Sequence, residues 1–232
     1  MSNSVRPNLV SAPDPSRASR STIRPSKGAA RVTIIAGNPR REIRLESHLE
    51  AKVAYVCLAD RRIADLWEQP PAVHYLDAQG RPRKHTFDLL LTTTTGTRIL
   101  VAVKPWRRVI AKDFGATLQQ IARQIPPSIA DKVLLVTERK LDRDRIHNAK
   151  LIHAVRRDPD SEADTAVGNY AETLHGSITI GDLVKATGLA ARGFSACIRL
   201  IDQGTLVPAG PQRLDYQAVV VRAPTLMTGA AA

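Results

Sequence analysis

The chain has 232 residues, 43% of them hydrophobic, which is enough to bury one ordinary core and at most a small second one. Its 34 lysines and arginines against 22 acidic residues give a formal net charge of +12, which favours a polyanion such as nucleic acid as partner. No apolar run approaches the roughly 18 residues of a membrane span, and no secretory signal is evident, so we expect a cytoplasmic protein.

The N-terminal segment, residues 1–40, is predicted to be a disordered basic arm. Residues 1–30 are rich in Ser, Pro, Arg and Ala without a period, a composition that buries too little apolar surface to order itself. Nine of the basic residues fall within residues 1–44, against two acidic ones. A solvated tail therefore accounts for part of the charge, but the rest of the chain is still basic.

A mixed α/β domain is predicted over residues 41–160. Its first helix, at about 45–60, has Glu46 and Glu50 one turn apart on one strip. Alternating residues and a turn at 77–80 predict a hairpin. The further elements predicted are strands at 84–92 and 98–104, a helix at 113–125, a strand at 132–137 and a basic helix at 142–157.

A second, smaller domain is predicted over residues 172–225. Residues 158–172 are acidic and polar, and we expect them to form a linker. Two short helices around Thr187-Gly188 are then followed by extended segments at 205–208 and 214–222. This order is typical of a winged helix-turn-helix domain.

The two cysteines, Cys57 and Cys197, each lie in a stretch with helical apolar spacing. We therefore expect them to be small buried apolar groups rather than metal ligands or a disulfide. The six histidines show no spacing typical of a metal site.

Asp88 and Lys104 are the residues that point most directly to chemistry. A metal-assisted phosphodiester hydrolase needs carboxylates to hold Mg²⁺ and a cation to position water or to offset charge on the phosphate. A strand bearing Asp, followed across a hairpin by a strand bearing (Glu or Gln)-x-Lys, presents these groups at one end of a sheet. Taken singly, an Asp in a strand is usually an edge residue and a Lys after a strand is usually solvated, so the pair needs its context.

That context is a series of motifs in order along the chain. They are Glu46-Ser-His-Leu-Glu50, Glu68-Gln-Pro70, His85-Thr-Phe-Asp88, Val101-Ala-Val-Lys-Pro105, Val136-Thr-Glu138 and Asn148. Together they resemble the signature of TnsA-type transposon endonucleases, members of the PD-(D/E)XK restriction-endonuclease-like superfamily. The resemblance covers roughly residues 42–222. It implies a restriction-endonuclease-like mixed sheet flanked by helices, followed by the winged-helix domain.

The resemblance also implies roles for individual residues. Glu50 and Asp88 would hold Mg²⁺, with Mn²⁺ as a substitute, and Lys104 would orient the attacking water; Glu46 is the alternative to Glu50. The family has Gln or Glu two residues before the lysine, whereas this chain has Ala102. Because a methyl group cannot coordinate a metal, weakened metal affinity or loss of cleavage would follow.

Several basic or aromatic residues are candidate DNA contacts. His85 precedes Asp88 by three residues, and Trp106, Arg107 and Arg108 follow Lys104 directly, where a solvated basic turn is the other interpretation. In the C-terminal domain the second helix, at about 189–202, carries Arg192 and Arg199 on its polar strip; because winged helices also dock proteins, this helix is not assigned to DNA alone.

Three functions remain open at this point. The first is a Mg²⁺-dependent DNA endonuclease subunit of a bacterial, nucleoid-associated transposase, which acts on double-stranded transposon ends beside a DDE-type transposase and an AAA+ ATPase regulator. The second is a catalytically silent relative that binds DNA and scaffolds the transposase, which Ala102 supports. The third is a winged-helix transcription regulator, which would bind an operator tightly and would not need Asp88.

Overall fold

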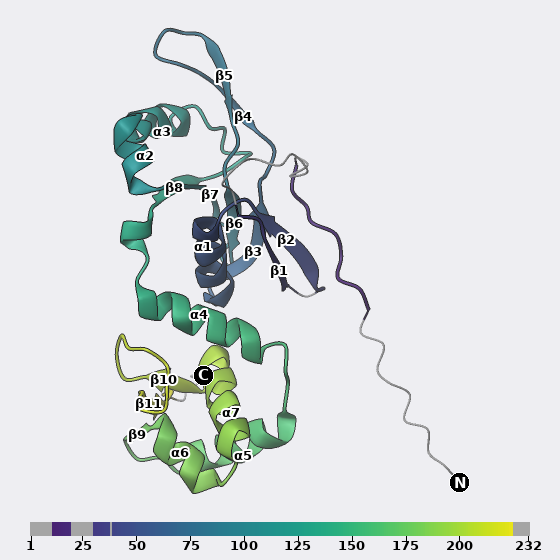
Figure 1. Cartoon of the computed structure of the whole chain (residues 1–232), viewed down its shortest axis with the longest axis vertical. Helices are drawn as coiled ribbons and strands as arrows, with labels where there is room; N and C mark the ends of the chain where they lie inside the picture. The colour runs from purple at the N-terminus through teal and green to yellow at the C-terminus, as the bar shows by residue number, and fades with distance from the viewer. Residues whose placement is uncertain (1–10, 20–29, 38, 225–232) are drawn as a thin grey trace, which may run out of the picture. The chain divides into compact units, whose positions relative to one another are not determined.

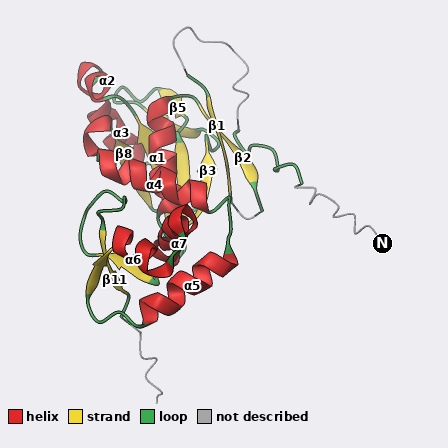
Figure 2. Cartoon of the chain, turned by 60° about the horizontal axis from the view of Figure 1, so that its bottom comes forward, coloured by secondary structure: helices red, strands yellow, loops and turns green. Residues whose placement is uncertain are grey.

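The computed structural model describes residues 11–19, 30–37 and 39–224. This part of the chain is a mixed α/β protein, as predicted, and it contains seven α-helices (Figure 1, Figure 2). The chain divides into two compact units. Unit 1 comprises Met1–Ala51 and Asp65–Leu135, and unit 2 comprises Lys52–Ala64 and Val136–Ala232. Each unit has its own hydrophobic core and is described separately below.

Unit 1 is built around a four-stranded sheet with the order β3-β6-β7-β8. The strands are β3 Ile63–Glu68, β6 Leu89–Thr93, β7 Arg98–Val103 and β8 Lys132–Val136. Strands β6 and β7 are antiparallel, with Leu89 opposite Val101, and a tight turn at Gly96 (φ +84°) joins them. Two further antiparallel pairs complete the unit: β1 Val32–Ala36 with β2 Arg41–Leu45, and β4 Val73–Leu76 with β5 Pro82–His85.

Helices α2 Trp106–Ala111 and α3 Phe114–Ala122 accompany these strands, together with the first turn of α1 His48–Ala59, whose residues from Lys52 onward belong to unit 2. The predicted helical spacing of α3 is borne out by burial, since Leu118 and Ile121 both face the core. A cluster of buried side chains forms that core beneath α3: Val73, Phe87, Leu100, Ala102, Leu118, Ile121 and Ala130. The helix thereby fixes the sheet next to the end of β7.

Unit 2 contains the later turns of α1, four further helices and a three-stranded antiparallel sheet with the order β10-β11-β9. The helices are α4 Arg143–Val155, α5 Ser161–Glu172, α6 Ile180–Thr187 and α7 Ala190–Gln203, and the strands are β9 Ser177–Thr179, β10 Leu206–Pro208 and β11 Val219–Arg222. A 3-10 turn, η1 Glu138–Lys140, precedes α4. Helix α6 ends at Gly188 (φ +66°), the turn predicted from the sequence.

The predicted linker at 158–172 is wrong, because Ser161–Glu172 forms α5. Its apolar residues Ala163, Val167 and Ala171 recur every four positions and are buried against the core of unit 2. The acidic residues that suggested a linker instead pair with arginines of α7: Arg199 contacts Asp164 at 2.7 Å. The prediction failed because the acidic residues suggested solvated chain and because the apolar side chains of this helix are small.

The predicted disordered arm is also wrong in part. Val32–Ala36 forms β1, whose residues pair in register with β2, Ile34 opposite Ile43. The segment around Asp14 contacts Arg41 through an isolated bridge. Residues 1–10 and 20–29 of the predicted arm lie outside the described residues.

Two strands replace the single strand predicted at 84–92. Strand β5 ends at His85 and β6 begins at Leu89, with Asp88 directly before β6. Strand β3 and helix α2 were not predicted. No helix within residues 11–19, 30–37 and 39–224 is both long and apolar enough to cross a bilayer.

Candidate active site

Asp88 and Lys104 meet at one end of the β6–β7 pair. Asp88 precedes β6 and Lys104 follows β7, and the start of one antiparallel strand lies beside the end of its partner. The Lys104 Nζ lies 2.9 Å from Oδ2 of Asp88 and 3.3 Å from its Oδ1. The structure therefore places the two residues as the strand order predicts.

The Asp88 carboxylate is held in place from several directions. Only 6% of the residue is exposed, and its Oδ2 accepts a 2.6 Å hydrogen bond from the backbone N–H of Val103. Its own backbone N–H donates to Val101, and its carbonyl accepts from the backbone N–H of Gln69. A buried carboxylate with this set of partners is fixed in orientation before any ligand arrives.

Glu50 brings a second buried carboxylate into the same region. It lies in the first turn of α1 and is 6% exposed. Its Oε2 accepts from the backbone N–H of Glu46 at 2.9 Å and its Oε1 from the hydroxyl of Ser47 at 2.8 Å, while Ser47 Oγ accepts from the Glu50 N–H. These bonds resemble a capping box, so Glu50 also stabilises the start of the helix.

The electrostatics of Glu50 connect it to the Asp88–Lys104 pair. Burial raises the pKa of the Glu50 carboxyl above its usual value, and the negative charge of Asp88 raises it further. Hydrogen bonds from Glu46 and Ser47 and the charge of Lys104 oppose this rise in the pKa. Of the two glutamates left open by the sequence, Glu50 lies in α1 and is buried, whereas Glu46 precedes the helix, contrary to the prediction, and is half-buried.

Position 102 is part of the hydrophobic core. Ala102 is 0% exposed and belongs to the cluster that contains Phe87, Leu118 and Ile121. A glutamine or glutamate there would need the neighbouring side chains to move, because interiors of this kind are already close-packed. Residue 102 is thus a core methyl group, and a polar side chain at this position would have to displace its neighbours.

The remaining carboxylates are compatible with a magnesium ion. Among the described residues no group of three or more His, Cys, Asp or Glu side chains is arranged to hold a metal. Mg²⁺, however, usually keeps several waters and uses only one or two protein carboxylates together with substrate phosphates. Glu50 and Asp88 are two buried carboxylates whose mutual repulsion raises the pKa of Glu50, and a cation between them would relieve that repulsion.

Gln69 supports Asp88 from the side of β3, a role that sequence analysis missed. It is 1% exposed and has a positive φ of 43°, a backbone conformation that costs a residue other than glycine roughly 1–3 kcal/mol. Its N–H donates to the Asp88 carbonyl at 2.9 Å, and its own carbonyl accepts from the N–H of Ser19 at 3.0 Å. The Gln69-Pro70 dipeptide gave no signal of this role, because a residue before proline is ordinarily extended rather than left-handed.

Glu68 anchors the N-terminal segment to the same stretch of chain. The carboxylate is fully buried, and its Oε1 accepts from Ser16 Oγ at 2.6 Å and from the Arg17 N–H at 3.0 Å. Its Oε2 accepts from Arg41 at 2.7 Å. The Trp67 indole N–H then donates to the Arg17 carbonyl at 2.7 Å. Residues 16–19 are therefore fastened to the end of β3, directly beside the residue that holds Asp88.

The predicted DNA contacts of unit 1 differ in accessibility. His85 is half-buried and stacks edge-on against Phe87, with ring centroids 4.8 Å apart. Trp106, Arg107 and Arg108 form the first turn of α2 rather than an irregular turn, and both arginines are exposed. Only these two arginines are thus presented to solvent immediately after Lys104 and Pro105.

The predicted polar strip on α7 is corrected by the structure. Arg199 is 6% exposed, and it donates to Asp164 at 2.7 Å and to the Asp158 carbonyl at 2.9 Å. This burial leaves the side chain inaccessible to DNA, and its charge holds α5 instead. Arg192 is half-exposed but pairs with both Asp160 and Glu162 at 2.7 Å.

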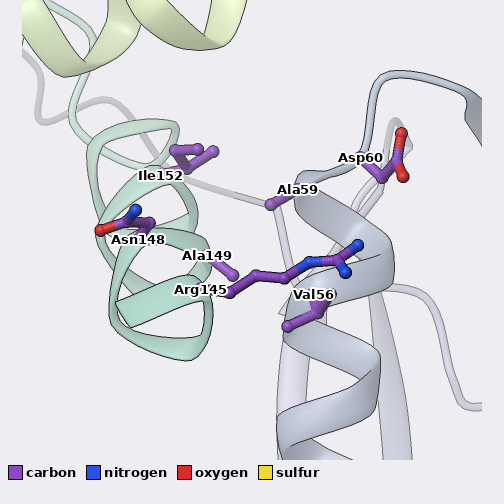
Figure 3. Close-up of a pocket in the computed structure, with 7 residues that line it drawn as sticks. All are labelled: Val56, Ala59, Asp60, Arg145, Asn148, Ala149 and Ile152. Carbon is purple, nitrogen blue, oxygen red and sulfur yellow. The ribbon is translucent and has the colours of Figure 1, made fainter. Parts of the chain in front are cut away.

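Asn148 and the nearby pocket belong to unit 2. The Asn148 side chain bonds the backbone of Gln212 and Leu214 at 2.8 Å each, which holds the loop between β10 and β11. Figure 3 shows Arg145 extending from α4 towards the last turns of α1. The pocket there has a volume of about 190 Å³, which is below the roughly 300–1,000 Å³ of ligand sites, and it contains none of the three candidate catalytic residues. It is lined by Val56, Ala59, Asp60, Arg145, Asn148, Ala149 and Ile152.

Comparison with known proteins adds no further assignment, because no protein-family model matches the chain and no curated protein matches it either. Function therefore has to be argued from the side chains and their geometry.

The raised pKa of Glu50 predicts a pH-dependent effect of Glu50→Gln. A carboxyl whose pKa is higher in the folded state contributes stability when it is protonated. This contribution is fully present below the unfolded-state pKa of about 4.5 and is lost as the pH rises through the folded-state pKa. The free energy of unfolding of Glu50→Gln relative to the wild type should therefore be greater at pH 7.5 than at pH 4, as measured by urea denaturation. Glu172→Gln, at an exposed position, controls for the loss of one charge; an equal Glu50→Gln effect at both values would contradict the assignment.

The burial of Glu68 predicts a large loss of stability in Glu68→Gln. The change would leave the Arg41 guanidinium, 12% exposed, without its countercharge, and breaking such a pair costs about 3 kcal/mol or more. Asp65→Asn is the matched control, because the Asp65–Arg17 pair is 48% and 40% exposed and is expected to contribute less than about 1 kcal/mol. Urea denaturation of the two variants should show this difference; similar midpoints would mean that Glu68 is not the anchor.

Proposed function

We propose that the chain is a metal-dependent DNA endonuclease, the nuclease subunit of a heteromeric transposase that cuts a phosphodiester at transposon ends. One observation carries the proposal: Glu50, Asp88 and Lys104, from three separate elements, form one electrostatically coupled group, with Lys104 Nζ 2.9 Å from Asp88. Two buried carboxylates beside a lysine are the groups that metal-assisted phosphodiester hydrolysis requires.

The surrounding fold supports a restriction-endonuclease-like assignment of unit 1. The antiparallel β6–β7 pair carries Asp88 and Lys104 at one end, and helix α1 supplies Glu50. In unit 2, the α6–α7 pair with its turn at Gly188, followed by β10 and β11, supports the winged-helix assignment. Both assignments agree with the resemblance noted in the sequence.

The proposed chemistry assigns a task to each residue. Glu50 and Asp88 would hold the Mg²⁺, which when bound supplies positive charge that stabilises the phosphate oxygens during attack. Asp88 presents a fixed carboxylate because Val103 and Gln69 hold its side chain and backbone. The Lys104 ammonium would orient the water and offset negative charge on the phosphate as the P–O ester bond breaks.

Ala102 favours one alternative, a catalytically silent protein that binds DNA and scaffolds the transposase. Its methyl group is fully buried with Leu118 and Ile121, so the core has no polar side chain at the position where the resemblance expects a ligand. The transcription-regulator hypothesis has less support, since Arg199 of α7 is buried against Asp164.

The proposal extends to partners and place by resemblance. A DDE-type transposase would cut and join the other strand, an AAA+ ATPase would regulate the assembly, and the complex would act on the bacterial nucleoid. The formal charge of +12 supports association with double-stranded DNA.

Nicking of supercoiled plasmid tests the endonuclease proposal. With Mg²⁺ or Mn²⁺, and with the transposase present or absent, the wild type should cut, and Asp88→Ala and Lys104→Ala should each lower the rate about 100-fold or more. Asp182→Asn, which removes an exposed carboxylate of unit 2, should cut like the wild type. Cleavage that survives Asp88→Ala would overturn the site assignment.

A substitution at position 102 separates the endonuclease from the silent scaffold. Ala102→Gln restores the ligand but needs room, so it is combined with Leu118→Ala in the same cluster; Leu118→Ala alone is the matched control. A several-fold gain of nicking by the double variant over its control would show that the metal site lacks only this ligand. If the wild type, Leu118→Ala and the double variant all fail to nick the plasmid but still bind DNA, the silent scaffold is favoured.

A further inference from the structure

The β4–β5 hairpin has no task in the proposed chemistry. Val73–Leu76 and Pro82–His85 pair antiparallel as a separate two-stranded sheet, with His74 opposite Lys84 and Leu76 opposite Pro82. Figure 1 shows its turn extending past the helices and the other strands of unit 1. A two-stranded hairpin is only marginally stable by itself, so we ask which contacts stabilise this one and what it could bind.

Its stability comes from the base of the hairpin. Val73 is buried in the core of unit 1, and Tyr75 packs against the same core. Gln120 of α3 and Gln124, just beyond the end of that helix, clamp the next residue. Gln124 Oε1 accepts from the Leu76 N–H at 2.8 Å, and Gln120 Nε2 donates to the Leu76 carbonyl at 2.9 Å. The hairpin is therefore a preorganised arm as far as Leu76.

The turn beyond Leu76 is organised by Asp77. Its Oδ1 accepts from the backbone N–H groups of Gln79 and Arg81, and its Oδ2 accepts from Nε of Arg81 and of Arg83 at 3.0 Å each. Desolvation alone would raise the pKa of Asp77, but these hydrogen bonds lower it to about 2. One carboxylate thus orients two guanidinium groups whose side chains are still 61% and 51% exposed.

The hairpin is basic on both faces. Residues 73–85 contain Arg81, Arg83 and Lys84 against Asp77, a net charge of +2 with histidine neutral. Arg83 lies opposite Tyr75, whereas Lys84 lies on the other face with Leu76, which is 51% exposed. Exposed cations on both faces of a narrow ribbon match the charge of a DNA groove, which has phosphates on both walls.

We propose that the β4–β5 hairpin is a DNA-binding ribbon that grips the phosphate backbone of duplex DNA next to the cut. It rests on the proposed function in one respect, namely that DNA is the substrate. The major groove admits a two-stranded ribbon of this kind. Lys84 precedes Asp88 by four residues, so their Cα atoms are at most about 14 Å apart even when the chain is fully extended, and the base of the ribbon is close to the proposed site.

Duplex binding by the full chain tests this proposal. A fluorescein-labelled duplex of about 30 base pairs is titrated by fluorescence anisotropy in EDTA, so that no cutting occurs, at several salt concentrations between 50 and 200 mM. For Arg83→Gln/Lys84→Gln we expect about tenfold weaker binding and a plot of log K against log salt whose slope is smaller by about 2, since each phosphate contact contributes about 0.9. Unchanged urea midpoints would show that the variant is folded.

Arg123→Gln/Lys132→Gln is the matched control, because it removes two exposed cations of unit 1 outside the hairpin. It should keep the wild-type affinity and slope within about twofold. The proposal is overturned if the control weakens binding as much as the hairpin variant, if the hairpin variant binds like the wild type, or if the wild type binds no duplex. Loss of a protein partner with unchanged DNA affinity would also overturn it, and would identify a protein-docking arm instead.

The two proposals fail in different ways. A wild type that nicks plasmid while the hairpin variant binds duplex normally would overturn only the ribbon. A wild type that never nicks, but loses duplex affinity in Arg83→Gln/Lys84→Gln, would overturn the endonuclease and leave the ribbon standing.

Discussion

A single buried carboxylate, that of Asp88, holds unit 1 together at its chemically important end. Burying a carboxylate is costly unless charged or hydrogen-bonding groups compensate it, and here the Val103 N–H and the Lys104 ammonium do so. Those two partners fix where β7 must end relative to β6. The Asp88 carbonyl in turn fixes Gln69 at the end of β3. The same bonds that make the charge tolerable therefore align three strands of the sheet.

Apolar spacing predicted most of the fold, and it failed where burial depends on partners far along the chain. Helix α3 and strand β7 were visible because large apolar residues recur at their own period. Helix α5 was not predicted, since the side chains that it buries are small. It also carries carboxylates that suggested solvated chain, and the partner of one of them, Arg199, is known only from the structure. Strand β1 was hidden in a basic segment, because its pairing with β2 is a tertiary contact.

The candidate site divides in a similar way. Residue types and order were sufficient to nominate Glu50, Asp88 and Lys104. Residue types and order could not indicate that Arg199 is buried, because α5, whose Asp164 pairs with it, was not predicted. They also could not show that the core has closed around Ala102. Local patterns identify side chains whose type suits a catalytic or binding role, whereas the accessibility of those side chains is set by packing between distant segments.

The attachment of Ser16 and Arg17 to Glu68 has a consequence for how the protein is made. Ser16 leaves the ribosome first, but its binding site is 52 residues further along the chain and is completed only when β3 has formed. Residues 16–19 therefore cannot be secured to unit 1 until the end of β3 has been made. Because Gln69 contacts both Ser19 and Asp88, the attachment of residues 16–19 and the support of Asp88 share one segment of backbone.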